Sequence, residues 1–167
     1  MRKLYAILVT LLFVTSVFGV ASITADGPTY SCNDYYRISR TSAHVGDILT
    51  ISLRVEALGD VNIGDKTISD IVTGIVANGG LPYQIGPLEL INVEYFDENW
   101  NLIHSGFIPS TPAQTKWITW TFRGAQPGTI SFTSDEEDCG DTVTITIAPK
   151  STPMNFFMKI IGFGKKK

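Results

Sequence analysis

Residue types that serve in catalysis and metal binding are scarce in this sequence. Its 167 residues include two histidines and two cysteines, and no Gly-x-Ser-x-Gly, His-Glu-x-x-His or phosphate-loop pattern occurs. Acidic pairs of the kind that glycosidases use are numerous, but spacing along the chain does not place any two across a cleft. We therefore expect a protein that is not an enzyme and holds no cofactor, with a small hydrolase as the least favoured alternative.

Basic residues are few between residues 22 and 149, where six of them accompany all sixteen acidic residues and leave a net charge of −10. Nucleic-acid binding needs a basic face, so this balance excludes nucleic acid as a partner. Five further lysines and no acidic residue follow residue 149. The charges therefore divide the chain into an acidic body and a basic tail.

Charged residues are absent from residues 4–20, which follow a short basic start. Such a start, an apolar run and small residues at Gly19 and Ala21 are typical of a secretory signal peptide. We predict a signal peptide over residues 1–21 and one domain over residues 22–149. An uncleaved anchor is the alternative, because an apolar run of this length can just span a membrane. Both place the domain outside the cytoplasm, secreted or associated with the cell surface.

The two cysteines, Cys32 and Cys139, lie near the two ends of the predicted domain. An even number of cysteines in an exported chain favours a disulfide. A bridge that closes so long a loop stabilises by about 4–5 kcal/mol in the chain-entropy model. We predict that Cys32 and Cys139 are joined, and two buried thiols are the alternative.

Alternation of apolar and polar residues predicts strands over most of the domain. Strict period two occurs in residues 49–56, 118–123 and 142–147, with threonine-rich outer faces that suit a pleated sheet. The apolar phase slips between residues 90 and 91, which predicts a β-bulge. Residues 97–99 predict a hairpin turn. We expect about seven strands that pack as two sheets, an all-β sandwich.

The period of one stretch is ambiguous. Residues 68–77 fit a helical period and a strand period, and Gly74 weakens the helix. We favour a strand or an irregular segment there. The first strand is expected over residues 30–38, with Cys32 in it. His44 is expected before a strand and His104 in a loop.

An acidic cluster surrounds Cys139. Hard cations such as Ca²⁺ take several oxygen ligands, but the EF-loop spacing is absent, and consecutive acidic residues on an extended chain point to opposite faces. We expect a solvated loop, with a weak divalent-cation site as the alternative. The candidate ligands are Asp135, Glu136, Glu137, Asp138 and Asp141.

Two proline-containing stretches, residues 78–87 and 106–114, predict binding loops on a rigid scaffold. The alternative is that their apolar side chains fold down onto the ends of the core. Trp117 lies on the face opposite Trp120, and Trp100 follows the predicted turn. Such outward aromatic residues bind sugar rings or a partner, although cross-strand packing explains them equally well. The binding-loop candidates are Leu81, Tyr83, Gln84, Phe107 and Ile108.

Residues 150–167 differ from the domain in composition. A Pro-bounded linker leads into a segment with roughly ten apolar residues, half of what a spanning helix needs. Basic segments with aromatic residues bind membrane interfaces and anionic polymers. We predict surface attachment, and a disordered terminus is the alternative. The attachment candidates are Phe156, Phe157, Lys159, Lys165, Lys166 and Lys167.

Two blocks of the sequence, Val45-Gly46-Asp47 with the strand after it and the segment from Trp120 to Phe132, resemble Ig-like modules of prokaryotic surface proteins, particularly small exported archaeal ones. The resemblance extends over residues 29–148 and implies a single Ig-like antiparallel β-sandwich. The same blocks are similar to chagasin-type cysteine protease inhibitors, whose Asn-Pro-Thr-Thr-Gly-Tyr loop this sequence lacks.

These features together predict an extracytoplasmic binding or structural module of the cell envelope or surface. The expected partner is a protein or an envelope polymer, with peripheral membrane contact through the tail. A secreted peptidase inhibitor that acts through the two loops is the alternative.

Overall fold

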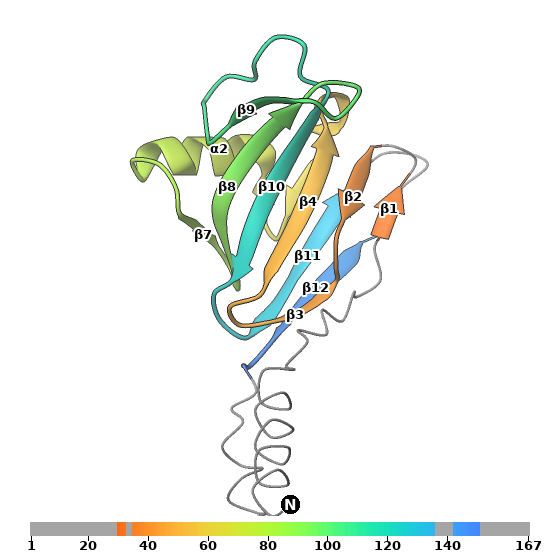
Figure 1. Ribbon diagram of the computed structural model, residues 1–167. Helices are drawn as coiled ribbons and strands as arrows, with labels where there is room; N and C mark the ends of the chain where they lie inside the picture. Colours follow the sequence, from red (N-terminus) through yellow and green to blue (C-terminus); the bar gives the residue numbers. More distant parts are fainter. Residues whose placement is uncertain (1–29, 33–34, 136–141, 151–167) are drawn as a thin grey trace, which may run out of the picture.

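The computed structural model describes residues 30–32, 35–135 and 142–150, which form twelve strands, one α-helix and one short 3₁₀-helix (Figure 1). The strands form two sheets whose inner faces share one hydrophobic core. The predicted all-β sandwich is confirmed. The expected number of strands is too low, because the chain changes direction through several strands of two or three residues that carry no readable period.

The larger sheet has seven strands, six of them in the order β1-β2-β4-β10-β8-β7. The seventh strand, β9, also pairs with β8: β7 pairs with the first residues of β8, and β9 pairs with its last residues. All of its pairs are antiparallel. The strands span Tyr30–Cys32 (β1), Tyr36–Ile38 (β2), Ile48–Arg54 (β4), Tyr83–Ile85 (β7), Leu88–Phe96 (β8), Leu102–Ser105 (β9) and Trp117–Gly124 (β10).

The smaller sheet has five strands in the order β3-β12-β11-β5-β6. Strand β3 runs parallel to β12, so this sheet is mixed, whereas an antiparallel sandwich was the expectation. The strands span Ser42–His44 (β3), Val61–Ile63 (β5), Lys66–Thr67 (β6), Gly128–Ser134 (β11) and Val143–Ala148 (β12). The 3₁₀-helix η1 spans Val55–Ala57, and the α-helix α2 spans Ile68–Ala77.

The first predicted strand is wrong in one respect. Residues 30–38 form a hairpin rather than one strand, with Cys32 opposite Tyr36 across β1 and β2. The chain reverses directly after Cys32, where the Tyr35 amide donates a hydrogen bond of 2.8 Å to the Cys32 carbonyl oxygen. The hairpin turn at residues 97–99 is confirmed, and the chain returns along β8 as strand β9.

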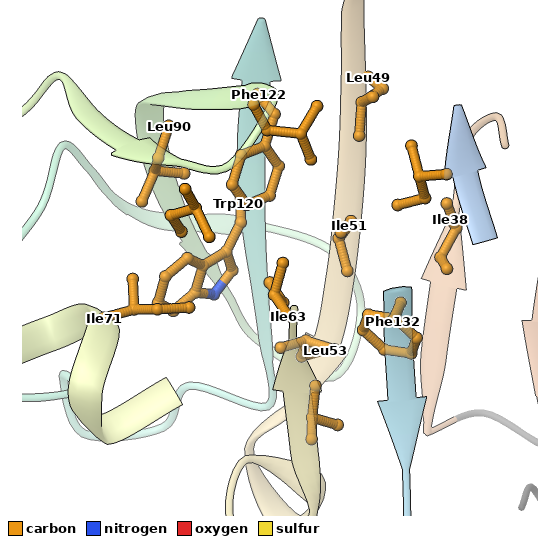
Figure 2. Packing of buried hydrophobic residues seen from close by; sticks show 14 of the residues in the cluster. Ile38, Leu49, Ile51, Leu53, Ile63, Ile71, Leu90, Trp120, Phe122 and Phe132 are labelled. Atoms are coloured by element: carbon orange, nitrogen blue, oxygen red, sulfur yellow. The ribbon is translucent and has the colours of Figure 1, made fainter. Parts of the chain in front are cut away.

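Period-two alternation places the core as predicted. Leu49, Ile51 and Leu53 of β4 face inward, and so do Trp120 and Phe122 of β10 (Figure 2). Phe132 of β11 and Ile145 of β12 meet them from the smaller sheet. The predicted bulge is also confirmed, because Thr121 pairs with Asn92 and Phe122 with Leu90, which leaves Ile91 as an extra residue.

Residues 68–77 form an α-helix, so the preference for a strand or irregular segment is wrong. The helix begins with a capping box: the Asp70 amide donates to Thr67 Oγ1 (3.1 Å), and the Thr67 amide donates to Asp70 Oδ2 (3.1 Å). These bonds supply partners for amides that a helix start leaves unpaired. Ile68, Ile71 and Ile75 then bury one helical face against the core.

Gly74 lets this helix pack closely. A Cβ atom at Gly74 would overlap the Tyr83 hydroxyl group, so the missing side chain allows α2 to lie against β7. The glycine that weakens the helix in the sequence thus permits its tertiary contact. Among the described residues, no helix is long and apolar enough to cross a membrane.

Candidate binding surface

The predicted binding loops contribute mainly to the core. Leu81, Tyr83, Phe107 and Ile108 are partly buried and pack against the core cluster, as the alternative for these two stretches predicts. Tyr83 and Gln84 lie in β7 and not in a loop. Gln84 is exposed, and its Nε2 atom donates a hydrogen bond of 2.6 Å to the Gly86 carbonyl oxygen. These side chains therefore do not form one open binding surface.

Ile108 is fastened to the sheet by Tyr95. The Tyr95 hydroxyl group donates to the Ile108 carbonyl oxygen (3.1 Å) and accepts from the Ile108 amide (3.4 Å). Burial raises the pKa of Tyr95 above its ordinary value of 10.0, and the hydrogen bond with Ile108 opposes this shift. The loop after β9 is thus held at its first residues.

Of the five acidic residues that form the alternative cation site, the structure describes Asp135. Asp135 is exposed, and its amide donates a hydrogen bond of 2.9 Å to the Asp60 carbonyl oxygen. Within the described parts of the chain, no group of three or more His, Cys, Asp or Glu side chains could hold a metal ion. The other four candidates, at positions 136–138 and 141, lie outside the described residues.

The disulfide and the tail stay predictions. Cys32 is not a free thiol, and its expected partner Cys139 lies outside the described residues. The attachment candidates between residues 156 and 167 lie outside them as well, as does the predicted signal peptide at residues 1–21.

The two histidines lie in strands at opposite ends of the sandwich. His104 is in β9 and not in a loop, with its ring centroid 5.9 Å from that of Tyr95. His44 is in β3, and its Nδ1 atom lies 3.6 Å from Oδ2 of Asp47. His44 and Asp47 line an open hollow of about 280 Å³ with Val45, Gly46 and Lys150.

Aromatic side chains gather on the outer face of the seven-stranded sheet. Trp117 points away from the core, as its alternation with Trp120 predicts, and it pairs with Phe96 of β8. The Trp100 ring stacks on Trp117 with 4.9 Å between centroids and 24° between planes, and it lies 5.6 Å from the ring of Phe96. Arg37 Cζ lies 5.2 Å from the centroid of Trp100 and 5.0 Å from that of Trp117. We call these four residues the aromatic platform.

The platform has a covered layer and an open layer. Trp117 is only 5% exposed, because Trp100 and Arg37 lie over it, whereas Trp100 is 39% exposed. Cross-strand packing therefore accounts for Trp117. It does not account for Trp100, which presents a large aromatic surface to solvent.

The backbone of Trp100 has an unusual conformation for so large a residue. Its φ is +62°, in the left-handed region. The Trp100 amide donates to the Asp97 carbonyl oxygen (3.2 Å), and the Asp97 amide donates to the Asn101 carbonyl oxygen (3.0 Å). Hairpin loops of this kind have a turn followed by one left-handed residue, a position that favours glycine. A bulky residue there is an outlier that costs about 1–2 kcal/mol.

Asp97 holds this turn rigidly. Its carboxylate accepts hydrogen bonds from the Asn99 amide (2.8 Å), the Asn101 amide (2.9 Å) and Nδ2 of Asn101 (2.9 Å). These bonds, first those from Asn101, hold the pKa of Asp97 below its ordinary value of 3.8. These hydrogen bonds fix the backbone on both sides of Trp100, so the turn positions its ring in the absence of a ligand.

A row of polar side chains crosses the sheet beside the platform. Ser52 and Thr119 share a hydrogen bond of 2.9 Å, Thr119 is opposite Glu94, and the Ser105 hydroxyl donates to Glu94 at 3.5 Å. Together with Arg37, which is opposite Ser52, the row extends over five adjacent strands. At a strand spacing of about 4.8 Å this is a distance of about 19 Å. Ser52 is buried, so the hydroxyl and carboxylate groups that this row offers on the outer face are those of Thr119, Glu94 and Ser105.

Sequence reasoning identified two of the four platform residues. The sequence predicts Trp100 and Trp117 as outward aromatic residues, but it does not predict Arg37 or Phe96 at this site. Arg37 reaches the tryptophans only through the β2–β4–β10 register, which no local pattern reveals. The outward orientation of Phe96 is a consequence of the bulge, because the shifted phase of β8 places Phe96 on the same outer face as Glu94.

Comparison with known proteins supplies no relative on which to base the function of this surface. No protein-family model matches the sequence, and no curated protein matches it.

Proposed function

We propose that this chain is an extracytoplasmic Ig-like binding module of the cell envelope or surface, and that it binds a protein or an envelope polymer through the aromatic platform. The observation that carries the proposal is the conformation of Trp100. A half-exposed tryptophan occupies a turn position that favours glycine. Backbone strain of this kind is concentrated at functional sites.

The composition of the platform supports binding. Tryptophan and arginine are the residue types that contribute most at binding surfaces, and both lie here on one open sheet face. Covering the exposed part of the Trp100 side chain would remove about 60–100 Å² from water, which is worth about 2 kcal/mol. This corresponds to roughly a 30-fold gain in affinity from one residue.

The rigid turn supports binding as well. Asp97 fixes the loop through three hydrogen bonds, so Trp100 loses little conformational freedom when a partner covers it. Pre-ordered side chains give more affinity per unit of buried area than mobile ones. The loop is therefore preorganised for binding.

The location outside the cytoplasm is inferred from the basic, apolar leader and the even number of cysteines in the sequence. Fractionation of the producing cell tests it directly. We expect the chain in the envelope or the medium, without its leader, and recovery from the cytosol with the leader intact would refute this part of the proposal.

Co-sedimentation with envelope fragments from the producing cell tests the binding. We expect the exported chain to pellet with the fragments and Trp100→Gly to weaken this binding roughly 30-fold. Val76→Ser is the control, because Val76 is an apolar residue on α2 that is more exposed (54%) than Trp100. Equal binding of the Trp100 variant and the parent would refute the proposed site. A parent chain that does not pellet would refute the function.

A further inference from the structure

The outer face of the larger sheet is polar beyond the aromatic platform. Helix α2 and the smaller sheet both pack against the inner face. Beside the polar row already described, the register places a second row, in which Thr121 is opposite Thr50 on one side and Asn92 on the other. The two rows contribute six residues that are at least partly exposed and carry hydroxyl, amide or carboxylate groups. These six are Thr119, Glu94, Ser105, Thr50, Thr121 and Asn92.

The positive charges of this face already have partners. Arg123 Nε donates a hydrogen bond of 3.0 Å to Oε2 of Glu89. Arg54 Nε and Lys116 Nζ each lie 3.6 Å from a carboxylate oxygen of Glu56. The arginine of the platform lies over the two tryptophan rings. Among the described residues, the face therefore has no unpaired cation that would attract an anionic polymer.

Glu94 has hydrogen-bonding capacity that its neighbours do not fill. A carboxylate has about four acceptor sites, and within the described parts of the chain Glu94 accepts one long bond of 3.5 Å, from the Ser105 hydroxyl group. It forms no ion pair with a described residue. Its charge would repel an anionic ligand, whereas neighbouring hydroxyl groups of an uncharged ligand would donate to it in charge-assisted hydrogen bonds.

The apolar area at this end is small for a protein partner. Beside Trp100, the exposed large hydrophobic residues are Leu102 and Ile103. Three side chains provide far less than the roughly 800 Å² that each partner buries in a stable protein interface. The rows beside them contain glutamate and serine, which are depleted at protein interfaces.

From these observations we infer that the ligand of the platform is an uncharged polysaccharide, with one sugar ring stacked on Trp100 and the next sugars hydrogen-bonded by the two polar rows. A sugar ring has an apolar face of C–H groups and a rim of hydroxyl groups. These match an open indole ring that lies beside hydroxyl, amide and carboxylate side chains. The inference rests on the proposed binding by the platform and specifies the ligand.

The register places the polar groups within reach of such a polymer. Thr119 and Thr121 follow Trp117 on the same face of β10, at two-residue intervals of about 7 Å. Glu94 precedes Phe96 of the platform by the same interval on β8. A chain of sugars that extends from Trp100 along the strands therefore meets successive hydrogen-bonding groups.

Fractionated envelope material from the producing cell tests the ligand class. The fragments are digested exhaustively with protease, and their extracted polysaccharide is separated by anion exchange into an unretained, uncharged fraction and a retained, anionic fraction. We expect the exported chain to pellet with digested and untreated fragments alike, and the uncharged fraction to displace it. Loss of pelleting after digestion, displacement by the anionic fraction alone, or displacement by neither fraction would overturn the inference and leave the platform proposal standing. A chain that does not pellet with untreated fragments would refute both.

Glu94→Gln tests the polar rows. The substitution keeps the shape of the side chain and removes its charge, so we expect roughly tenfold weaker binding of the uncharged fraction. Asp65→Asn is the control, because it removes one negative charge from the turn between β5 and β6 of the smaller sheet and should bind like the parent. Circular dichroism establishes that both variants fold. Equal binding by Glu94→Gln would remove the rows from the site, and tighter binding would indicate an anionic ligand; either result overturns the inference.

Discussion

Comparison of two substitutions at Trp100 separates the backbone strain from the side-chain contact. Trp100→Gly and Trp100→Ala both remove the stacked ring, but only glycine adopts a φ of +62° without penalty. Glycine ordinarily destabilises a structured segment relative to alanine, by roughly 0.5–1 kcal/mol. At this position we expect the reverse order, with Trp100→Gly more stable than Trp100→Ala by about 1 kcal/mol.

The magnitude relative to the parent follows from burial. Trp100 is 39% exposed, so it buries about 90–150 Å², and removal of the ring costs about 2–4 kcal/mol. Relief of the left-handed strain returns about 1–2 kcal/mol in the glycine variant. The net loss in Trp100→Gly is therefore about 1–2 kcal/mol, well below the roughly 3–5 kcal/mol for truncation of a core tryptophan.

Urea unfolding of the parent and both variants at pH 7 measures these differences. Unfolding is followed by circular dichroism, because both variants have lost a tryptophan and their fluorescence differs from that of the parent. A difference of 1 kcal/mol also separates the two melting temperatures by about 3–6 °C for a domain of this size. If Trp100→Ala proves as stable as Trp100→Gly, or more stable, the strain assigned to Trp100 does not exist. The main support for the platform as a binding site would then be lost.

Three further outcomes are expected from the rest of the fold. Gly74→Ala should lower the free energy of unfolding by about 1–3 kcal/mol, because the new methyl group overlaps the Tyr83 hydroxyl; Tyr83→Phe in the same chain should restore part of this, and a fully stable Gly74→Ala would contradict the packing of α2. Thr67→Ala should lower the free energy of unfolding by about 1 kcal/mol through loss of the capping box with Asp70. An unchanged urea midpoint in this variant would show that the helix start is not capped in this way. The carboxylate of Asp97 has a lowered pKa, so its stabilising effect is present above pH 3.8 and is lost as the pH falls through its folded value; urea midpoints between pH 6 and pH 2 should therefore fall less steeply in Asp97→Asn than in the parent.

The parts of the fold that the sequence predicts are those governed by period two. Strands β4, β10 and β12 alternate strictly, and the phase slip at Ile91 marks the bulge, because one extra residue exchanges the two faces of a strand. The short strands at residues 30–44 and 61–67 have no such signal, since two or three residues do not define a period.

Helix α2 shows why a local penalty misleads. Gly74 lowers helix propensity by about 1 kcal/mol, and the apolar residues fit both periods. The deciding signals were a Thr67-x-x-Asp70 cap at the start and the close contact of Gly74 with Tyr83. The first is readable from the sequence. The second is a tertiary contact across separate elements, which no local pattern contains.

The position of the platform relative to the tail links the two predicted attachments. The Val45 amide donates to the Ala148 carbonyl oxygen (2.9 Å), and the Gly46 amide donates to the Gly124 carbonyl oxygen (2.8 Å), so β12 ends beside the last residue of β10 (Figure 1). Trp117 is the first residue of that eight-residue strand, about 23 Å away at 3.3 Å per residue. If residues after Ala148 attach the chain to the envelope as predicted, the platform lies at the opposite end of the sandwich, where a partner can reach it without displacing the attachment.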